Sequence, residues 1–136
     1  MIVVYTGGVY DLLHKGHLRL LKKAKSLGDY LIVGIQEDTS VMQTKPKPIL
    51  STQERVEQMQ ELPFVDKIVI YSATQTPETI ASVMPNVFVH GDDWEEQMDR
   101  GVVIKFMKDH NIGIVLLPRT QDISTSELKR RVRETK

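Results

Sequence analysis

The sequence predicts an α/β fold in which a parallel five-stranded sheet is covered by helices on both faces. Five short runs rich in β-branched and apolar residues have the character of strands. Segments with helical periodicity lie between these runs, and a strict alternation of strands and helices is typical of parallel sheets. The runs are apolar almost without interruption, as expected for strands that are buried on both sides. With 136 residues, the chain is long enough for a core, and we interpret residues 1–136 as a single domain.

The strands are predicted from these apolar runs. They are expected at Ile2–Thr6, Tyr30–Gly34, Lys67–Tyr71, Val87–His90 and Gly113–Leu117. In sheets of this kind a ligand binds beyond the carboxyl ends of the strands, at the point where the strand order reverses. We therefore expect the functional residues to lie in the segments that follow the strands.

The helices are predicted from apolar residues that recur at intervals of three or four. Between the first two strands these residues are Leu20, Leu21, Ala24 and Leu27. The next helix begins with the capping-box sequence Ser-Thr-Gln-Glu at residues 51–54 and has Val56, Met59 and Leu62 as its apolar stripe. A short third helix is expected over Thr79–Met84, because Pro85 disfavours its continuation.

Two further helices are expected in the second half of the chain. The first has the stripe Met98, Val102 and Phe106, with Val103 as a further candidate. The second begins at the capping box Ser124–Glu127. Earlier in the chain, Glu37–Leu50 has no regular pattern, and we expect it to act as a lid.

The composition argues against several classes of protein. Eighteen Lys and Arg residues balance eighteen Asp and Glu residues, and only 6% of residues are aromatic, so we expect no nucleic-acid partner. Because the chain has no cysteine, it has neither disulfides nor thiolate metal sites, which agrees with a reducing compartment. The apolar run Ile2–Tyr5 is too short for a signal peptide or a membrane span. We expect a cytoplasmic protein that is not attached to a membrane.

A first candidate phosphate site follows the first strand. Gly8 stands at the end of that strand, where a glycine lets the backbone come close to a ligand. His14 and His17 follow with Gly16 between them, at the expected start of a helix. The free N–H groups and the positive end of the helix dipole attract phosphate there. Two surface histidines, or a metal-binding pair, are the alternatives; no further cluster of metal ligands accompanies the pair.

A second candidate phosphate site follows the last strand. Arg119 offers a planar fork that matches phosphate oxygens. Ser124, Thr125 and Ser126 stand at the expected start of the last helix, where hydroxyl and N–H groups form a cradle. An ordinary helix N-cap is the alternative, but it leaves Arg119 and the run of three hydroxyls unexplained. Two such sites at opposite ends of one small domain indicate a nucleoside triphosphate gripped from both sides.

Taken together, these segments resemble the cytidylyltransferase family. The resemblance is carried by the first strand, by residues 10–17 (Tyr-Asp-Leu-Leu-His-Lys-Gly-His) and by residues 119–126 (Arg-Thr-Gln-Asp-Ile-Ser-Thr-Ser). It extends through residues 27–30, 54–55, 64–67 and 90–94. The resemblance implies a Rossmann-like fold, a homodimer, and transfer of CMP from CTP to a small phosphorylated alcohol with release of pyrophosphate. Glycerol 3-phosphate is the best-matching acceptor, and Mg²⁺ is the implied cofactor.

The resemblance, together with the chemistry of this transfer, implies roles for individual residues. The catalytic residues are expected to be His14, His17, Lys45 and Arg119. The nucleotide is expected to contact Gly8, Val9, Tyr10, His14, Gly16, His17, Gly91, Asp92, Asp93, Arg119, Thr120, Ile123, Ser124, Thr125 and Ser126. The acceptor is expected to meet Asp11, Lys45, Lys47 and Trp94, with Asp11 orienting either His17 or the acceptor. Mg²⁺ is expected on the triphosphate, without a side-chain ligand.

Departures from the family pattern leave alternatives open. Val9 stands where the family usually has threonine, and Asp122 replaces the usual glycine. Pro63 replaces an arginine common in members that use glycerol phosphate or phosphocholine, and residues 72–77 lack a lysine. The part of the site expected to bind the nucleotide thus largely follows the family pattern, whereas the part expected to bind the acceptor departs from it. The alternatives are phosphoethanolamine, phosphocholine, a phosphonate or a sugar phosphate as acceptor, ATP in place of CTP, or a nucleotide-binding domain without turnover.

Overall fold

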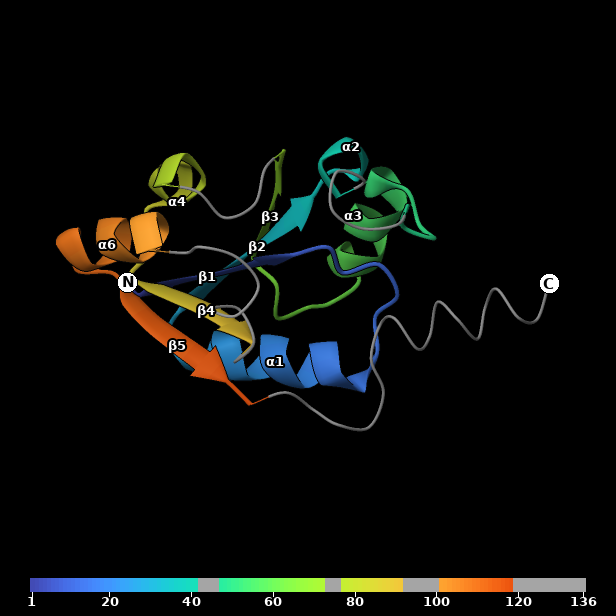
Figure 1. Ribbon diagram of the computed structural model, residues 1–136. Helices are drawn as coiled ribbons and strands as arrows, with labels where there is room; N and C mark the ends of the chain where they lie inside the picture. Colours follow the sequence, from blue (N-terminus) through green and yellow to red (C-terminus); the bar gives the residue numbers. More distant parts are fainter. Residues whose placement is uncertain (42–46, 73–76, 92–100, 119–136) are drawn as a thin grey trace.

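The centre of the fold is a parallel five-stranded sheet in the order β3-β2-β1-β4-β5. The computed structural model describes residues 1–41, 47–72, 77–91 and 101–118 (Figure 1). The strands are β1 (Val3–Gly8), β2 (Tyr30–Gln36), β3 (Lys67–Tyr71), β4 (Val87–Gly91) and β5 (Gly113–Leu117). The predicted α/β class and all five strands are confirmed, with β1 and β2 each reaching two residues further than expected.

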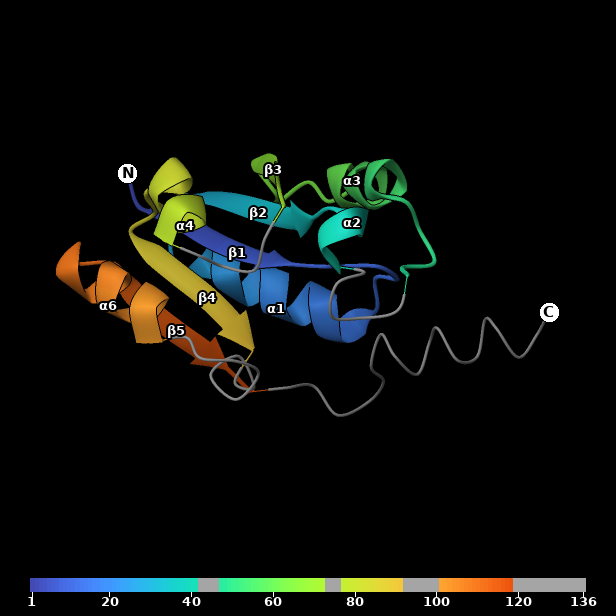
Figure 2. The same ribbon diagram turned by 45° about the horizontal axis from the view of Figure 1, so that its top comes forward.

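The strand order reverses beside β1. The chain passes outward from β1 to β2 and β3, and then returns to the other side of β1 to add β4 and β5. Figure 2 shows the arrowheads of β1, β2, β4 and β5 at the same end of the sheet, where α1 begins. The carboxyl ends of β1 and β4 therefore form the switch point at which such sheets bind ligands.

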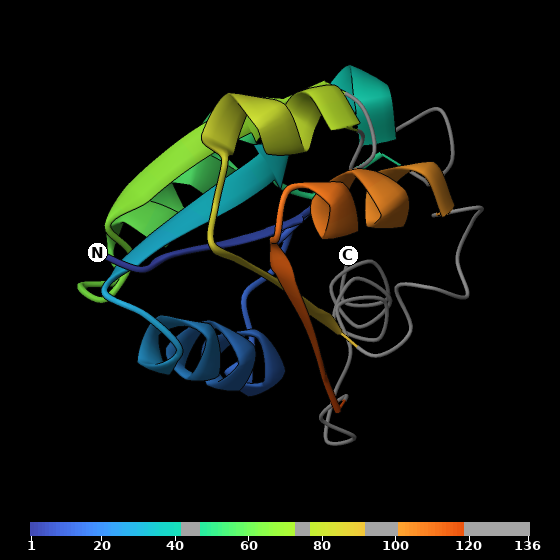
Figure 3. The same cartoon turned by 90° about the vertical axis from the view of Figure 1, so that its left-hand side faces the viewer.

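Helices cover both faces of the sheet. One core contains Leu21 and Ala24 of α1 (Lys15–Ser26) together with Val56 and Met59 of α3 (Thr52–Gln60). The opposite core contains residues of α4 (Pro77–Val83) and α6 (Gly101–Asp109). Figure 3 shows α1 on one side of the sheet and α4 and α6 on the other. This arrangement buries both sides of the central strands, as their continuous apolar sequence requires.

The capping box predicted for α3 is present. The Ser51 hydroxyl accepts a hydrogen bond from Glu54 N at 3.1 Å, and the Glu54 carboxylate accepts one from Ser51 N at 3.0 Å. Each side chain thereby satisfies a backbone N–H that has no partner within the helix. The helix ends before Leu62, which packs against the core from the following turn.

The apolar stripe of α6, the segment after β2 and the bounds of α4, expected over Thr79–Met84 and observed at Pro77–Val83, differ from the sequence prediction. Within α6 the buried residues are Val103 and Met107, four apart, whereas Val102 is 69% exposed; the expected stripe is therefore wrong at Val102. Because residues four apart share a helix face, burial of Val103 turns Val102 outward. The expected irregular stretch Glu37–Leu50 also contains a short helix, α2 (Asp38–Val41). The predicted Met98 and the predicted last helix lie outside the described residues.

No helix in the described part of the chain has both the length and the apolar character needed to span a membrane.

Candidate active site

The first turn of α1 carries the two predicted histidines. His14 is the N-cap residue, with an extended backbone, and its Nδ1 accepts a hydrogen bond from Gly16 N at 3.0 Å. This bond assigns the proton of the neutral ring to Nε2, which becomes a donor. His17 lies within the same turn, beside the N–H groups that begin the helix. The helix therefore starts where a phosphate site requires it, directly after the switch point.

The histidine rings are stacked against each other. Their centroids are 4.0 Å apart with planes inclined by 23°. Burial, and then the charge of His14, lower the pKa of His17 to about 4, although a hydrogen bond with the Leu12 backbone acts in the opposite direction. Burial also lowers the pKa of His14. Both rings are therefore neutral at neutral pH before a ligand binds, and a polyanion would favour their protonation.

Tyr10 supports His17 from within the fold. Its ring meets His17 edge to face, with centroids 5.3 Å apart, and burial raises the pKa of its hydroxyl to about 12. That hydroxyl lies 3.3 Å from the Thr6 hydroxyl. A Cβ atom on Gly8 would lie 3.2 Å from the Tyr10 ring, so glycine allows this close approach. The side chain of Tyr10 lies in the core, and the expected contact of this residue with the nucleotide stays a prediction.

Asp11 has backbone partners that the sequence analysis did not name. It is fully buried, and its two carboxylate oxygens accept hydrogen bonds from Ile49 N at 2.7 Å and Leu50 N at 2.8 Å. Sequence analysis expected it to orient His17 or to meet the acceptor. The observed bonds make it a link between the histidine turn and the end of the segment that contains Lys47. Asp11 and Leu50 are separated by 39 positions, which is why local sequence reasoning missed the contact.

Arg55 is a structural residue of the site to which the sequence analysis gave no role. Its side chain is fully buried, and it donates to Val9 O at 2.8 Å and to Gln36 O at 2.7 Å. Its remaining partners are Leu50 O, the Thr52 hydroxyl and the Asp38 carboxylate. Since Arg55 stands four residues before the buried Met59, helical periodicity places it on the inner face of α3. A charge at such a position indicates a buried polar network.

The other predicted residues are partly within the described structure. Gly8 and Gly91 end neighbouring strands at the switch point, Gly16 lies in the first turn of α1, and Lys47 is exposed. The predicted residues outside the described part are Lys45, Asp92, Asp93, Trp94, Arg119, Thr120, Ile123, Ser124, Thr125 and Ser126. The second phosphate site therefore stays a prediction. In the described ranges, no three His, Asp or Glu side chains gather where they would hold a metal ion.

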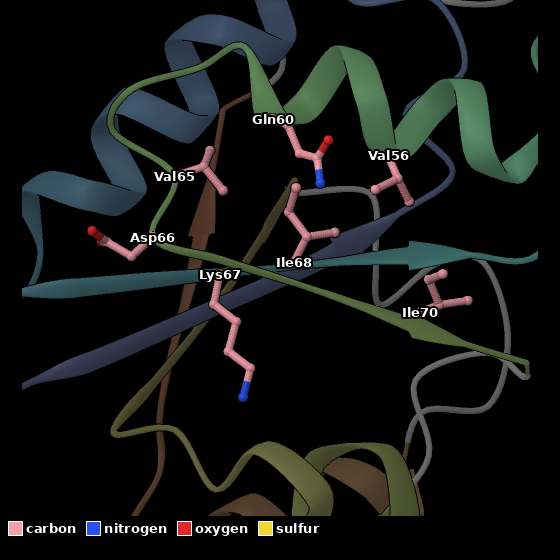
Figure 4. A pocket seen from close by; sticks show the side chains of 7 residues that line it. All are labelled: Val56, Gln60, Val65, Asp66, Lys67, Ile68 and Ile70. Atoms are coloured by element: carbon pink, nitrogen blue, oxygen red, sulfur yellow. The ribbon is translucent and has the colours of Figure 1, made fainter.

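Two cavities flank β3 rather than the histidine turn. One, of about 290 Å³, is lined by Val56, Gln60, Val65, Asp66, Lys67, Ile68 and Ile70 (Figure 4). The other, of about 590 Å³, is lined by Glu37, Val69, Ile70, Tyr71, Ser72, Glu78, Thr79 and Ser82. Neither contains His14 or His17, so the candidate site is defined by the side chains of the histidine turn.

Comparison with known proteins agrees with this geometry. A family model described as cytidylyltransferase-like matches residues 5–131. The chain is 38% identical over 130 residues to a glycerol-3-phosphate cytidylyltransferase of Bacillus subtilis, covering 95% of both chains. It is 35% identical over 134 residues to an ethanolamine-phosphate cytidylyltransferase of Dictyostelium discoideum, covering 96% of this chain and 37% of the relative.

Other similar proteins carry different names. The chain is 32% identical over 133 residues to the bifunctional protein HldE of Desulfatibacillum aliphaticivorans, covering 96% of this chain but 27% of that protein. Among solved structures, it is similar to a lipopolysaccharide core biosynthesis protein from Thermoplasma volcanium, with a TM-score of 0.74 and 28% identity. That match covers 88% of this chain and 97% of the other. Proteins with different printed names are thus similar to this chain, one in sequence and one in fold.

Proposed function

Because this chain belongs to the cytidylyltransferase-like family, we propose that it transfers CMP from CTP to a small phosphorylated alcohol and releases pyrophosphate. The observation that carries the proposal is the stacked pair His14 and His17 at the start of α1, beside the strand-order reversal. A helix N-terminus with two ring donors at this place in the sheet suits a phosphate chain.

The reaction needs positioning more than proton transfer. An oxygen of the acceptor phosphate attacks the α-phosphorus of CTP, and the bond between that phosphorus and the oxygen bridging to the β-phosphate breaks. A phosphomonoester has its second pKa near ~6, so it is largely a dianion at neutral pH and needs no general base. Catalysis then depends on aligning two polyanions and neutralising their charge.

The histidine turn supplies donors for the charge that develops at the α-phosphate. The hydrogen bond from Gly16 N to His14 Nδ1 leaves Nε2 of that ring as a donor. His17 is held against His14 by stacking and against Tyr10 by an edge-to-face contact, so its ring is oriented before CTP arrives. Preorganised donors of this kind stabilise a transition state without a further cost of reorganisation.

The remaining roles are carried over from the sequence analysis. We propose that Arg119 neutralises the departing pyrophosphate, that Ser124 and Thr125 hold the outer phosphates, and that Lys45 neutralises the acceptor phosphate. We propose that Mg²⁺ would be bound by the triphosphate oxygens, without a side-chain ligand. When bound, it would neutralise part of the triphosphate charge. We also propose that the protein is a homodimer and lies in the cytoplasm.

Glycerol 3-phosphate is the acceptor that we place first. One similar protein is named for glycerol 3-phosphate and another for ethanolamine phosphate, so both compounds should be tested as acceptors. Pro63, in place of the arginine common in glycerol-phosphate members, favours testing both. Phosphocholine, phosphonates, sugar phosphates and the use of ATP are the further alternatives.

Pyrophosphate release tests the proposal. The purified protein is incubated with Mg²⁺, with CTP or ATP, and with each acceptor in turn, and the nucleotide product is identified by chromatography. We expect pyrophosphate only with CTP and a phosphorylated acceptor. The variant His17→Ala should lower turnover by roughly 10²-fold while circular dichroism shows an intact fold. Preferential use of ATP would make the protein an adenylyltransferase, and CTP binding without turnover on any acceptor would make it a binding domain.

A further inference from the structure

Gln58 of α3 contacts the histidine-bearing turn at two consecutive residues. Its Nε2 donates hydrogen bonds to Tyr10 O and to Asp11 O, each at 2.8 Å. A carboxamide nitrogen carries two hydrogens, so both are engaged by neighbouring carbonyls of one turn. Gln58 lies 48 and 47 positions from Tyr10 and Asp11 in the sequence, and its side chain joins α3 to both of them.

The turn needs such a partner because of its conformation. Tyr10 has φ = 50°, in the left-handed region that residues other than glycine rarely adopt. A backbone held in this region persists where the surrounding structure restrains it. Tyr10 and Asp11 are also buried, and buried carbonyl groups require hydrogen-bond donors. Gln58 meets both requirements with one amide.

The restrained turn supports the candidate site in two directions. Towards α1, the Tyr10 ring contacts His17, which is stacked on His14. Towards the segment after Lys47, the Asp11 carboxylate accepts the N–H groups of residues 49 and 50. A shift of the turn would therefore move the histidine pair and this segment relative to each other.

One turn earlier on α3, Arg55 donates to Val9 O. The inner face of α3 thus holds the carbonyls of residues 9, 10 and 11 in succession. From this contact pattern we infer that Gln58 is a positioning residue, whose amide fixes the turn so that His14 and His17 are aligned on the transferred phosphate. This inference rests on the proposed function for its catalytic consequence.

Two substitutions distinguish the effect of the hydrogen-bond donors of Gln58 from the effect of its size. Gln58→Met keeps a side chain of similar length but offers no hydrogen to the carbonyls. Gln58→Glu keeps the shape and replaces the donors by carboxylate oxygens, which repel carbonyl oxygens. Gln53→Met is the matched control, since Gln53 is an exposed glutamine of the same helix that donates to Glu57 at 3.1 Å.

Kinetics and histidine NMR signals are measured for each variant. Both Gln58 variants should lower kcat by about 10-fold or more, with KM for CTP changed less than about threefold, because alignment matters most in the transition state. In the protein without substrate, the ring signals of His14 and His17 should shift and their titration should move. Gln53→Met should match the wild type in every measurement.

The two readouts keep the inference separable from the proposed function. A kcat within about twofold of wild type in both Gln58 variants would overturn the positioning role. So would a loss of kcat with unchanged His14 and His17 signals. If the wild type transfers no nucleotide to any acceptor, the proposed function fails, but the NMR comparison still decides whether Gln58 positions the histidines. Should Gln58→Met not fold, the same measurements on Gln58→Glu decide.

Discussion

The substitution Arg55→Met would remove a buried cation that joins the candidate site to the sheet. Its guanidinium donates to Val9 O and Gln36 O and contacts the Asp38 carboxylate, while the whole residue is inaccessible to solvent. Methionine is a good helix former and fills much of the same volume, but it supplies no donor. The variant would therefore remove a donor from three backbone carbonyls, those of Val9, Gln36 and Leu50, and from the Asp38 carboxylate.

The expected loss in the free energy of unfolding follows from the groups that Arg55 contacts. Removing one member of a buried ion pair costs about 3–5 kcal/mol, and each buried carbonyl left without a donor costs about 1–3 kcal/mol. These costs overlap because one guanidinium serves all of these groups, and water reaches Asp38, whose side chain is 28% exposed. We therefore expect the free energy of unfolding to fall by about 3–5 kcal/mol. For a chain of this size, that loss lowers Tm by roughly 10–20 °C.

Urea denaturation followed by circular dichroism measures the effect, at pH 7 and at one protein concentration. Lys105→Met is the control, because Lys105 and Asp109 form an exposed ion pair one helical turn apart, at 2.8 Å. That variant should unfold at the wild-type midpoint. A loss of less than about 1 kcal/mol for Arg55→Met would show that the buried network does not hold these segments together.

Four further predictions follow from single residues. The pKa of His17 is lowered from 6.5 to about 4, so the unfolded chain binds more protons than the folded chain between these pH values. The free energy of unfolding should therefore fall as the pH falls from about 6.5 to 4. In urea denaturation at a series of pH values, His17→Gln should flatten this dependence, and an unchanged slope would contradict the assignment. Asp11→Asn keeps only one acceptor for two N–H groups and should lower the free energy of unfolding by about 1–3 kcal/mol in the same assay. Phe88→Ala removes a fully buried ring and should cost about 3–5 kcal/mol by calorimetry or urea titration, and a smaller loss would mean that the core refills the cavity. Arg119→Lys should lower kcat/KM for pyrophosphate release, because a point charge does not reproduce a planar fork; wild-type kinetics would remove Arg119 from the site.

The strands and helices were predictable because their causes are local. Strand positions follow from apolar runs, and the start of α3 follows from the reciprocal bonds of Ser51 and Glu54, which are three residues apart. His14 and His17 lie within one turn, so their proximity at the start of α1 also follows from sequence spacing. Helix facing was less predictable: at α6, Val102 and Val103 are both apolar, and only packing decides which of them is buried.

The sequence by itself thus determined the α/β class, the strands and the histidine pair, since each depends on residues that are close along the chain. Tertiary structure decided the order β3-β2-β1-β4-β5, which no local pattern specifies. It also decided that Asp11 holds residues 49 and 50, and that Arg55 and Gln58 hold residues 9–11. These bonds join groups 38 to 48 positions apart, and a polar side chain does not reveal its partner until packing brings distant backbone groups within its reach.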